Sequence, residues 1–193
     1  MKPLAALAFA LALTAPAAAA NWTVDAARST LGFEVTAQGQ PFTTVFKDWS
    51  AVISFDPADL SNANATVTIN LGSVDSGDRQ RDGMMASKSW FDTLGATFSA
   101  PQGVPPGQAV FQTTAFRKTG NTTYEADGTL AMRDVVKPVT LPFTLVITGS
   151  EAHMTGAVTI NRTEWGVGQG QYAGSDPVAT DVKISVDLIA TAQ

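Results

Sequence analysis

The residues that most often carry out chemistry in enzymes are scarce in this chain. It contains one histidine, His153, and no cysteine. A thiolate nucleophile is therefore excluded, and a metal set or a Ser-His-Asp triad would have to be built on that single imidazole. No Gly-x-Ser-x-Gly motif occurs. We expect no metal site, and we interpret His153 as an outward-facing or hydrogen-bonded side chain on a strand.

Two further patterns resemble catalytic motifs but have simpler explanations. Residues 166–170 read GVGQG, yet they follow a predicted strand without opening a helix, as a phosphate-binding loop would. We interpret them as a loop at the mouth of the fold. The acidic residues Asp56, Asp59, Asp75 and Asp78 flank turns and a helix start, where capping explains them. No acid–base pair remains, so we predict that the protein is not an enzyme.

Alternation of apolar and polar residues predicts the elements that would position any site. Because successive strand side chains point to opposite faces, repeated alternation gives one wet surface and one apolar interior. Glycine and asparagine between the segments favour hairpin turns and hence antiparallel neighbours. We expect an all-β fold, an extended antiparallel β-barrel of about eight strands. The predicted strands are residues 30–38, 49–56, 65–73, 109–118, 122–133, 138–148, 152–161 and 180–192.

Three of these segments alternate most clearly and place Ile69, Leu145 and Ile184 on their apolar faces. We expect all three side chains to point into the barrel. Pro142 lies within a strong strand pattern but cannot donate a ladder hydrogen bond, so it should lie at a seam or an edge. Residues 76–90 are charged and lack β-branched side chains, which predicts one short helix inserted into the barrel.

The first 20 residues have the pattern of a cleaved secretory signal. Lys2 precedes an apolar run that ends near Pro16, and residues 18–20 are alanines. The run is too short for a membrane-spanning helix, which needs roughly 20 apolar residues. We expect a signal peptide over residues 1–20, one domain over residues 21–193, and export to a bacterial periplasm, where a cysteine-free fold needs no disulfide.

The charge pattern argues against two kinds of partner. The formal net charge is −5, from 12 basic and 17 acidic residues, without a run of like charges. This pattern argues against nucleic acid and against an anionic membrane surface as partners.

Several separated motifs resemble the YceI-like family of secreted lipocalin-like proteins. They are Trp22-Thr23-Val24-Asp25 followed by Ser29, Ile53-Ser54-Phe55-Asp56-Pro57, Ser73-Val74 with Arg81-Asp82 and Trp90-Phe91-Asp92, Gly128-Thr129-Leu130 with Lys137-Pro138-Val139, and Ile160-Asn161-Arg162 followed by Trp165-Gly166-Val167. The resemblance runs from Trp22 to about Ala190. It implies a lipocalin-like extended barrel with a helix over part of it. It also implies a pocket for a polyisoprenoid or a related long-chain lipid, with no covalent cofactor.

We predict that apolar side chains from the strands, the helix and the strand ends line this pocket. Phe46, Trp49, Trp90, Phe91 and Trp165 lie near strand ends, where they would surround an opening. The full set of predicted ligand-binding residues is Phe33, Val35, Phe46, Trp49, Ile53, Val67, Ile69, Met84, Met85, Trp90, Phe91, Phe98, Leu130, Met132, Leu145, Trp165, Ile184 and Val186.

Charged residues within these motifs allow two interpretations. Arg81, Asp82 and Arg162 could form a structural ion pair that joins the helix to the barrel, which is the interpretation we favour. Alternatively, Arg81 and Arg162 could contact a lipid head group, because apolar pockets often use a few polar groups for orientation.

The leading hypothesis is a non-enzymatic periplasmic carrier for a polyisoprenoid, such as an isoprenoid quinone. The alternative is an accessory protein that docks on a membrane cytochrome or another membrane redox protein, and it predicts a large apolar surface patch. We expect a monomer or a homodimer.

Overall fold

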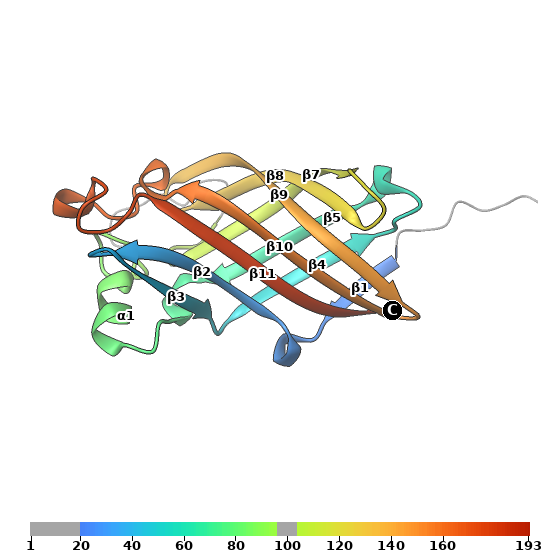
Figure 1. Cartoon of the computed structure of the whole chain (residues 1–193), viewed down its shortest axis with the longest axis horizontal. Coiled ribbons are helices and arrows are strands. Elements are labelled where there is room, and N and C mark those ends of the chain that lie inside the picture. The colour runs from blue at the N-terminus through green and yellow to red at the C-terminus, as the bar shows by residue number, and fades with distance from the viewer. Residues whose placement is uncertain (1–19, 96–103) are drawn as a thin grey trace, which may run out of the picture.

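Long antiparallel strands wind around a common axis in the computed structural model, which describes residues 20–95 and 104–193 (Figure 1). The strands are β1 (Ala20–Val24), β2 (Thr30–Ala37), β3 (Gln40–Phe46), β4 (Trp49–Phe55), β5 (Asn64–Asn70), β6 (Val74–Asp75), β7 (Gln108–Lys118), β8 (Thr123–Met132), β9 (Val135–Thr148), β10 (Glu151–Asn161) and β11 (Asp181–Ala192). The helix α1 spans Arg79–Ala86, and short 3₁₀ turns cover Ala26–Arg28, Leu60–Asn62, Leu71–Ser73, Arg162–Trp165 and Gly170–Tyr172.

Eight of these strands close the barrel. They follow the order β1, β4, β5, β7, β8, β9, β10, β11, and β11 pairs back onto β1 between Trp22↔Ala192 and Val24↔Ala190. The predicted fold class, an all-β lipocalin-like antiparallel barrel with one helix, is therefore confirmed. Closure leaves no exposed edge along most of the sheet.

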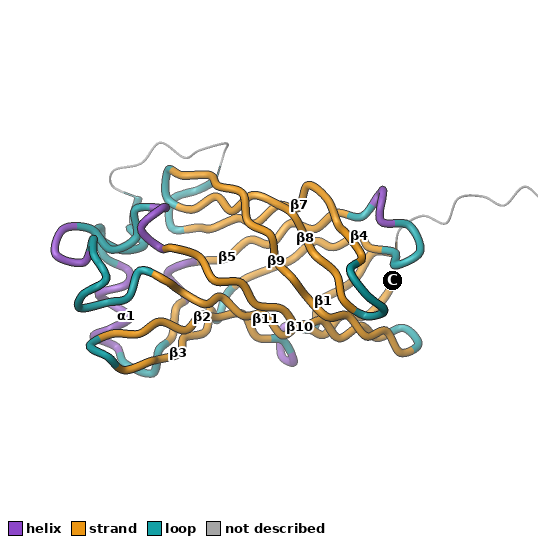
Figure 2. The backbone as a smooth tube through the Cα atoms, turned by 45° about the horizontal axis from the view of Figure 1, so that its top comes forward, coloured by secondary structure: helices purple, strands orange, loops and turns teal. Residues whose placement is uncertain are grey.

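A second group of strands extends the wall at one end. The first half of β11 pairs with β2, from Lys183↔Glu34 to Asp187↔Thr30, instead of with β1. Beyond β2 follow β3 and the short β6, which leads into α1. Figure 2 shows this β2–β3 hairpin beside α1, at the end of the barrel opposite the C-terminus.

All eight segments predicted from alternation form strands, but β1, β3 and β6 were not among them. The turn after β2 is Gln38-Gly39, and β3 starts at Gln40, within the stretch between two predicted strands. Pro41 pairs with Thr36 of β2, and the β6 ladder reaches only Val45 and Phe46, so the proline lies where β3 has a free edge. A proline is tolerated at such a position because no ladder donor is required.

Pro142 marks a seam, as predicted. The β9–β10 ladder runs from Thr148↔Glu151 to Phe143↔Gly156 and ends there. The adjacent Pro142 has no N–H with which to continue it. On its other side β9 remains paired with β8 along its whole first part.

The predicted helix is shorter than the segment assigned to it. Asp78 caps α1 by accepting hydrogen bonds from the backbone N–H groups of Gln80 and Arg81, at 2.9 and 3.1 Å. These bonds hold the pKa of Asp78 below its ordinary value. The helix ends at Ala86, and residues 87–95 form turns. Asp56, Asp59 and Asp75 likewise accept backbone hydrogen bonds two residues ahead, so the capping interpretation of these carboxylates is correct.

Candidate ligand-binding site

The interior of the barrel contains two apolar cavities in series. The first, cavity 1, lies at the α1 end and has a volume of about 140 Å³. The second, cavity 2, has a volume of about 170 Å³ and extends toward the opposite end. Of the residues in its wall, only Thr113 is polar, and its hydroxyl is bonded to the backbone of Ala65.

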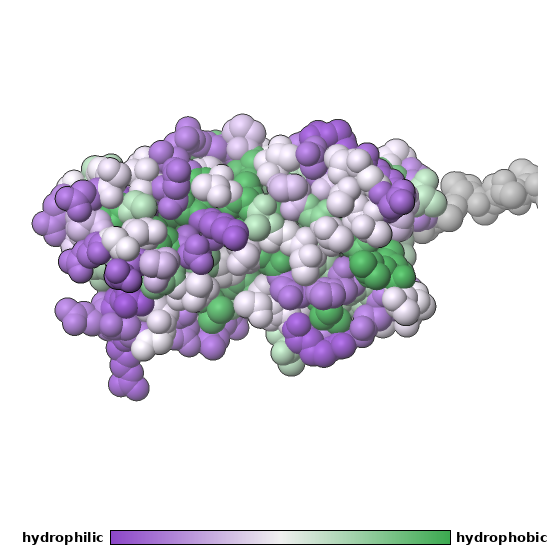
Figure 3. Space-filling view, in the orientation of Figure 1, coloured by the Kyte–Doolittle hydropathy of each residue, from purple (hydrophilic) through white to green (hydrophobic). Residues whose placement is uncertain are grey.

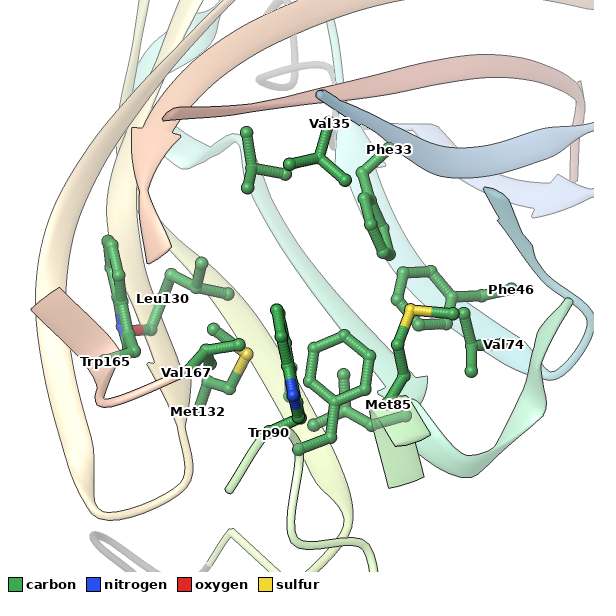
Figure 4. Packing of buried hydrophobic residues seen from close by; sticks show 14 of the residues in the cluster. Phe33, Val35, Phe46, Val74, Met85, Trp90, Leu130, Met132, Trp165 and Val167 are labelled. Carbon is green, nitrogen blue, oxygen red and sulfur yellow. The ribbon is translucent and has the colours of Figure 1, made fainter. Parts of the chain in front are cut away.

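Most of the predicted pocket residues line these cavities. Those at cavity 1 are Phe33, Val35, Phe46, Met84, Met85, Trp90, Phe91 and Met132, together with the charged Arg81 and Arg162. Those at cavity 2 are Trp49, Ile53, Val67, Leu145 and Val186. Ile69, Leu130 and Ile184 line both. Figure 4 shows the side chains of cavity 1 converging from β2 and β3 on one side and β8 on the other.

Trp165 does not surround an opening, contrary to the prediction. Its side chain is only 2% exposed, lines neither cavity, and donates from Nε1 to the carbonyl of Leu130 at 3.0 Å. The 3₁₀ turn after β10 carries the indole back into the barrel wall beside Leu130 (Figure 4). Phe98, another predicted pocket residue, lies outside the described residues.

The barrel interior is hollow rather than filled. Among the described residues, no large side chain is less than 2% exposed, and inward-facing residues such as Val67, Ile69 and Ile184 remain partly accessible. Closely packed protein interiors leave few voids larger than a water molecule. The accessible surface of these side chains therefore belongs to a space that something else can occupy.

Aromatic rings close the barrel at the end far from α1. Phe55 packs edge-on against Phe116 and Tyr124, with ring centroids 5.1 and 5.7 Å apart. Phe143 stacks on Tyr124 at 5.4 Å. These rings form a separate cluster at the far end of cavity 2, and Phe55, Phe116 and Phe143 are part of the cavity wall.

Two segments, residues 87–92 and residues 166–179, form a cap over cavity 1, and Arg162 organises the second of them. Its guanidinium donates to the carbonyls of Ala179 (2.9 Å), Val167 (2.7 Å), Tyr172 (2.7 Å), Gly174 (3.0 Å) and Val178 (2.8 Å). Gly168, at φ +77°, allows this approach, because a Cβ there would lie 2.0 Å from Nη1. Burial lowers the pKa of Arg162. The loop over residues 166–179 is thus wrapped around one buried cation.

The favoured interpretation of an ion pair between helix and barrel is wrong. Within the described ranges, the bonds of Arg162 go to backbone carbonyls and its guanidinium lies 5.1 Å from the Trp90 ring. Asp82 accepts from the backbone and hydroxyl of Ser76. Arg81 pairs with Asp78 of its own helix at 3.8 Å. Backbone carbonyls replace the expected carboxylate because the loop folds around Arg162.

A second buried arginine, which the sequence analysis missed, holds the other side of the cap. Arg133, at the β8–β9 turn, donates to the carbonyls of Lys88 and Trp90. Burial lowers its pKa, and the carboxylates of Asp92 and Asp134 oppose that shift. The two cap segments, residues 87–92 and residues 166–179, meet where the N–H groups of Gly168 and Gln169 donate to the Ser89 carbonyl at 2.8 and 2.9 Å.

Arg81 lies at the mouth of cavity 1. Its side chain is 32% exposed, lines the cavity, and places its guanidinium carbon 4.3 Å from the Phe42 ring centroid. Ala37, Phe42 and Met84, which are also partly exposed, line the same cavity. The donors of Arg162 are used by the cap, so Arg81 is the better-placed contact for a polar group at this end.

Several lining residues lay outside the sequence prediction. Alternation along β7, β9 and β10 could have indicated Phe111, Leu141 and Val158. Phe42 belongs to the unexpected β3, and Val167 and Val178 belong to the 166–179 loop. Val167 and Val178 carry no periodic signal, because their positions depend on how the loop folds.

The outer surface offers no comparable site in the ranges that the structure describes. His153 faces outward on β10, and its Nε2 lies 2.8 Å from the carboxylate of Asp187 on β11. Among the described residues, no group of three or more His, Cys, Asp or Glu side chains is arranged to hold a metal ion. Over the same ranges, no helix has the length and hydropathy needed to cross a bilayer.

A closed antiparallel barrel around an apolar hollow defines a lipocalin-like protein. Comparison then places the chain within this class: a family model for the YceI-like domain matches residues 22–190. The chain therefore belongs to the YceI-like family.

Known proteins resemble the chain along most of its length. A UPF0312 protein of Pseudomonas savastanoi is 28% identical over 177 residues, covering 86% of this chain and 87% of that protein. The crystal structure of Burkholderia cenocepacia BcnA has a TM-score of 0.79 and 30% identity, over 88% of this chain and all (100%) of that one. A domain of Saccharophagus degradans described as polyisoprenoid binding has a TM-score of 0.67, with 16% identity, over 89% of this chain and 98% of that one.

Proposed function

We propose that this protein is a periplasmic carrier that binds a polyisoprenoid or a related long-chain lipid, such as an isoprenoid quinone, without changing it chemically. The observation that carries the proposal is the pair of apolar cavities in series, with charged side chains in the wall only at the α1 end. Such a space suits a long apolar chain with one polar end. The polyisoprenoid-binding description of the Saccharophagus domain, which shares the fold, supports the same ligand class.

Burial of the hydrocarbon chain of the lipid is sufficient to hold the ligand in the barrel. Each CH₂ group removed from water contributes about 0.8 kcal/mol. Several isoprene units therefore outweigh an association cost of roughly 4–15 kcal/mol.

Native mass spectrometry of protein from an osmotic-shock fraction tests this function. We expect the exported protein to begin at Asn21, after signal cleavage, and to carry a lipid that organic solvent extracts. Prenyl quinones added to delipidated protein should bind one per chain. Folded protein that contains no lipid and binds no added prenyl quinone would rule the carrier out, and an N-terminus at Met1 would rule out the cleaved signal.

Arg81→Ala tests the polar end of the site. We expect a loss of roughly tenfold in affinity for a prenyl quinone, the size of one hydrogen bond to a charged group. The melting temperature should fall by less than about 3 °C, because the Asp78 pair and the Phe42 contact are partly exposed. Arg79→Ala on the same helix is the matched control, since Arg79 is exposed and lines neither cavity. If Arg81→Ala and Arg79→Ala bound the prenyl quinone with equal affinity, Arg81 would not be a ligand contact.

The docking alternative has no specific support from the surface. The exposed large apolar residues of the described ranges are Val52, Leu94, Val146 and Ile147, and β4 and β9, which carry three of them, lie on opposite sides of the ring. Singly exposed apolar side chains are normal on soluble proteins. The face in Figure 3 mixes polar and apolar residues and is mainly hydrophilic near α1.

A further inference from the structure

Four side chains separate the two cavities. Of the described residues, Leu31, Ile69, Leu130 and Ile184 alone line both cavity 1 and cavity 2. We call this group the waist. All four are Leu or Ile, and they come from four different strands, β2, β5, β8 and β11.

The topology places the waist residues on opposite walls. In the ring of eight strands, β7 lies opposite β11, and β5 and β8 are its two neighbours. Ile69 and Leu130 therefore face β11, which carries Ile184. Leu31 lies beside Ile184 on the adjoining β2, where Leu31 pairs with Val186. The waist thus consists of two opposed pairs of aliphatic side chains at the place where the two cavities adjoin.

The volumes of the two cavities limit the size of the ligand that each can hold. Pockets for drug-sized ligands occupy about 300–1,000 Å³. Cavity 1, at about 140 Å³, and cavity 2, at about 170 Å³, are each too small for such a ligand. Together they reach the lower end of that range. A ligand with a long chain must therefore extend from cavity 1 past the waist into cavity 2.

We propose that the waist is the element that determines chain-length specificity, because it admits a flexible prenyl chain from cavity 1 into cavity 2. This inference rests on the proposed function and adds to it that the first isoprene units occupy cavity 1 and the later ones cavity 2. Leu and Ile suit this role. Their side chains change rotamer without breaking a hydrogen bond, and they present only methyl and methylene groups to a branched hydrocarbon.

Ile184→Trp tests the waist by closing it from one wall. The probes are two ubiquinone homologues with the same head group, one with two isoprene units and one with eight, titrated calorimetrically into delipidated protein. Each methylene kept out of an apolar cavity lowers the binding constant by roughly fourfold. We expect the eight-unit homologue to lose affinity at least about a hundredfold. The two-unit homologue, of which only the end of the chain reaches the waist, should lose at least about tenfold less.

Ser185→Trp is the matched control, because Ser185 is the next residue on β11 and is exposed. It should bind both homologues as the wild type does. An Ile184→Trp variant that binds the eight-unit homologue with unchanged affinity overturns the waist proposal but leaves the carrier intact. If the wild type binds neither homologue, the proposed function itself fails.

A widening variant keeps the proposal testable should the tryptophan prevent folding. Leu130→Ala removes one side of the waist, so the eight-unit homologue should keep at least the advantage over the two-unit homologue that it has in the wild type. A smaller advantage in folded Leu130→Ala protein would contradict the waist, because it would show that Leu130 holds the chain rather than limits its passage.

Discussion

Replacing Arg162 with alanine should lower the melting temperature by roughly 10 °C. The guanidinium donates to the carbonyls of five residues in and around the 166–179 loop, at distances of 2.7 to 3.0 Å. A hydrogen bond to a charged group contributes about 1.5–3 kcal/mol, and bonds that share one donor group do not add fully. We therefore expect a loss of about 3–5 kcal/mol in the free energy of unfolding, and each kcal/mol shifts a domain of this size by about 2–4 °C.

Two further variants separate the hydrogen bonds from the charge. Arg162→Lys retains the cation but offers three donors in place of five, and it cannot span carbonyls on both sides of the loop. The melting temperature of Arg162→Lys should lie between those of Arg162→Ala and the wild type. Arg28→Ala removes an exposed arginine paired with Asp25 and Glu151 and should lower the melting temperature only slightly, because water screens exposed ion pairs. A normal melting temperature for Arg162→Ala, with lost lipid binding, would instead make Arg162 a head-group contact.

The strands could be predicted because their signal is local. The side-chain period of a strand is two, so alternation in β5, β9 and β11 indicated both the strands and their inward faces. Ile69, Leu145 and Ile184 line the cavities for that reason. β3 was missed because Pro41 and the Thr43-Thr44 pair interrupt its alternation. Only its pairing with β2 identifies it as a strand.

The cap could not be predicted, because its bonds join side chains to backbone carbonyls. Nothing in the type or spacing of residues 167, 172, 174 and 178 marks them as partners of Arg162, since every residue has a carbonyl. The same holds for Arg133, which binds the carbonyls of Lys88 and Trp90. The arginine in the motif suggested a carboxylate partner, but backbone carbonyls of the loop accept its hydrogen bonds instead.

Ile184→Glu should abolish lipid binding at neutral pH while the protein still folds. Ile184 faces both cavities, so the carboxylate would stand at the middle of the path of the ligand. Contact between a charge and a hydrocarbon chain without water is very unfavourable. In the empty barrel, however, water can enter around the new group, because the cavities already exist. Ser185→Glu, on the exposed neighbour of the same strand, should bind lipid normally.

The pH dependence of Ile184→Glu distinguishes a hollow barrel from a filled core. An apolar environment raises the pKa of the new carboxyl above its unfolded value of about 4.3. The group is neutral in both states below the unfolded pKa, so it destabilises the fold progressively as the pH rises from there through the raised folded pKa. Lipid binding should therefore partly return on acidification, and the melting temperature should approach that of the wild type. A variant that does not fold between pH 5 and pH 7 would show that the side chains around Ile184 form a filled core, and the carrier would then lack its cavity.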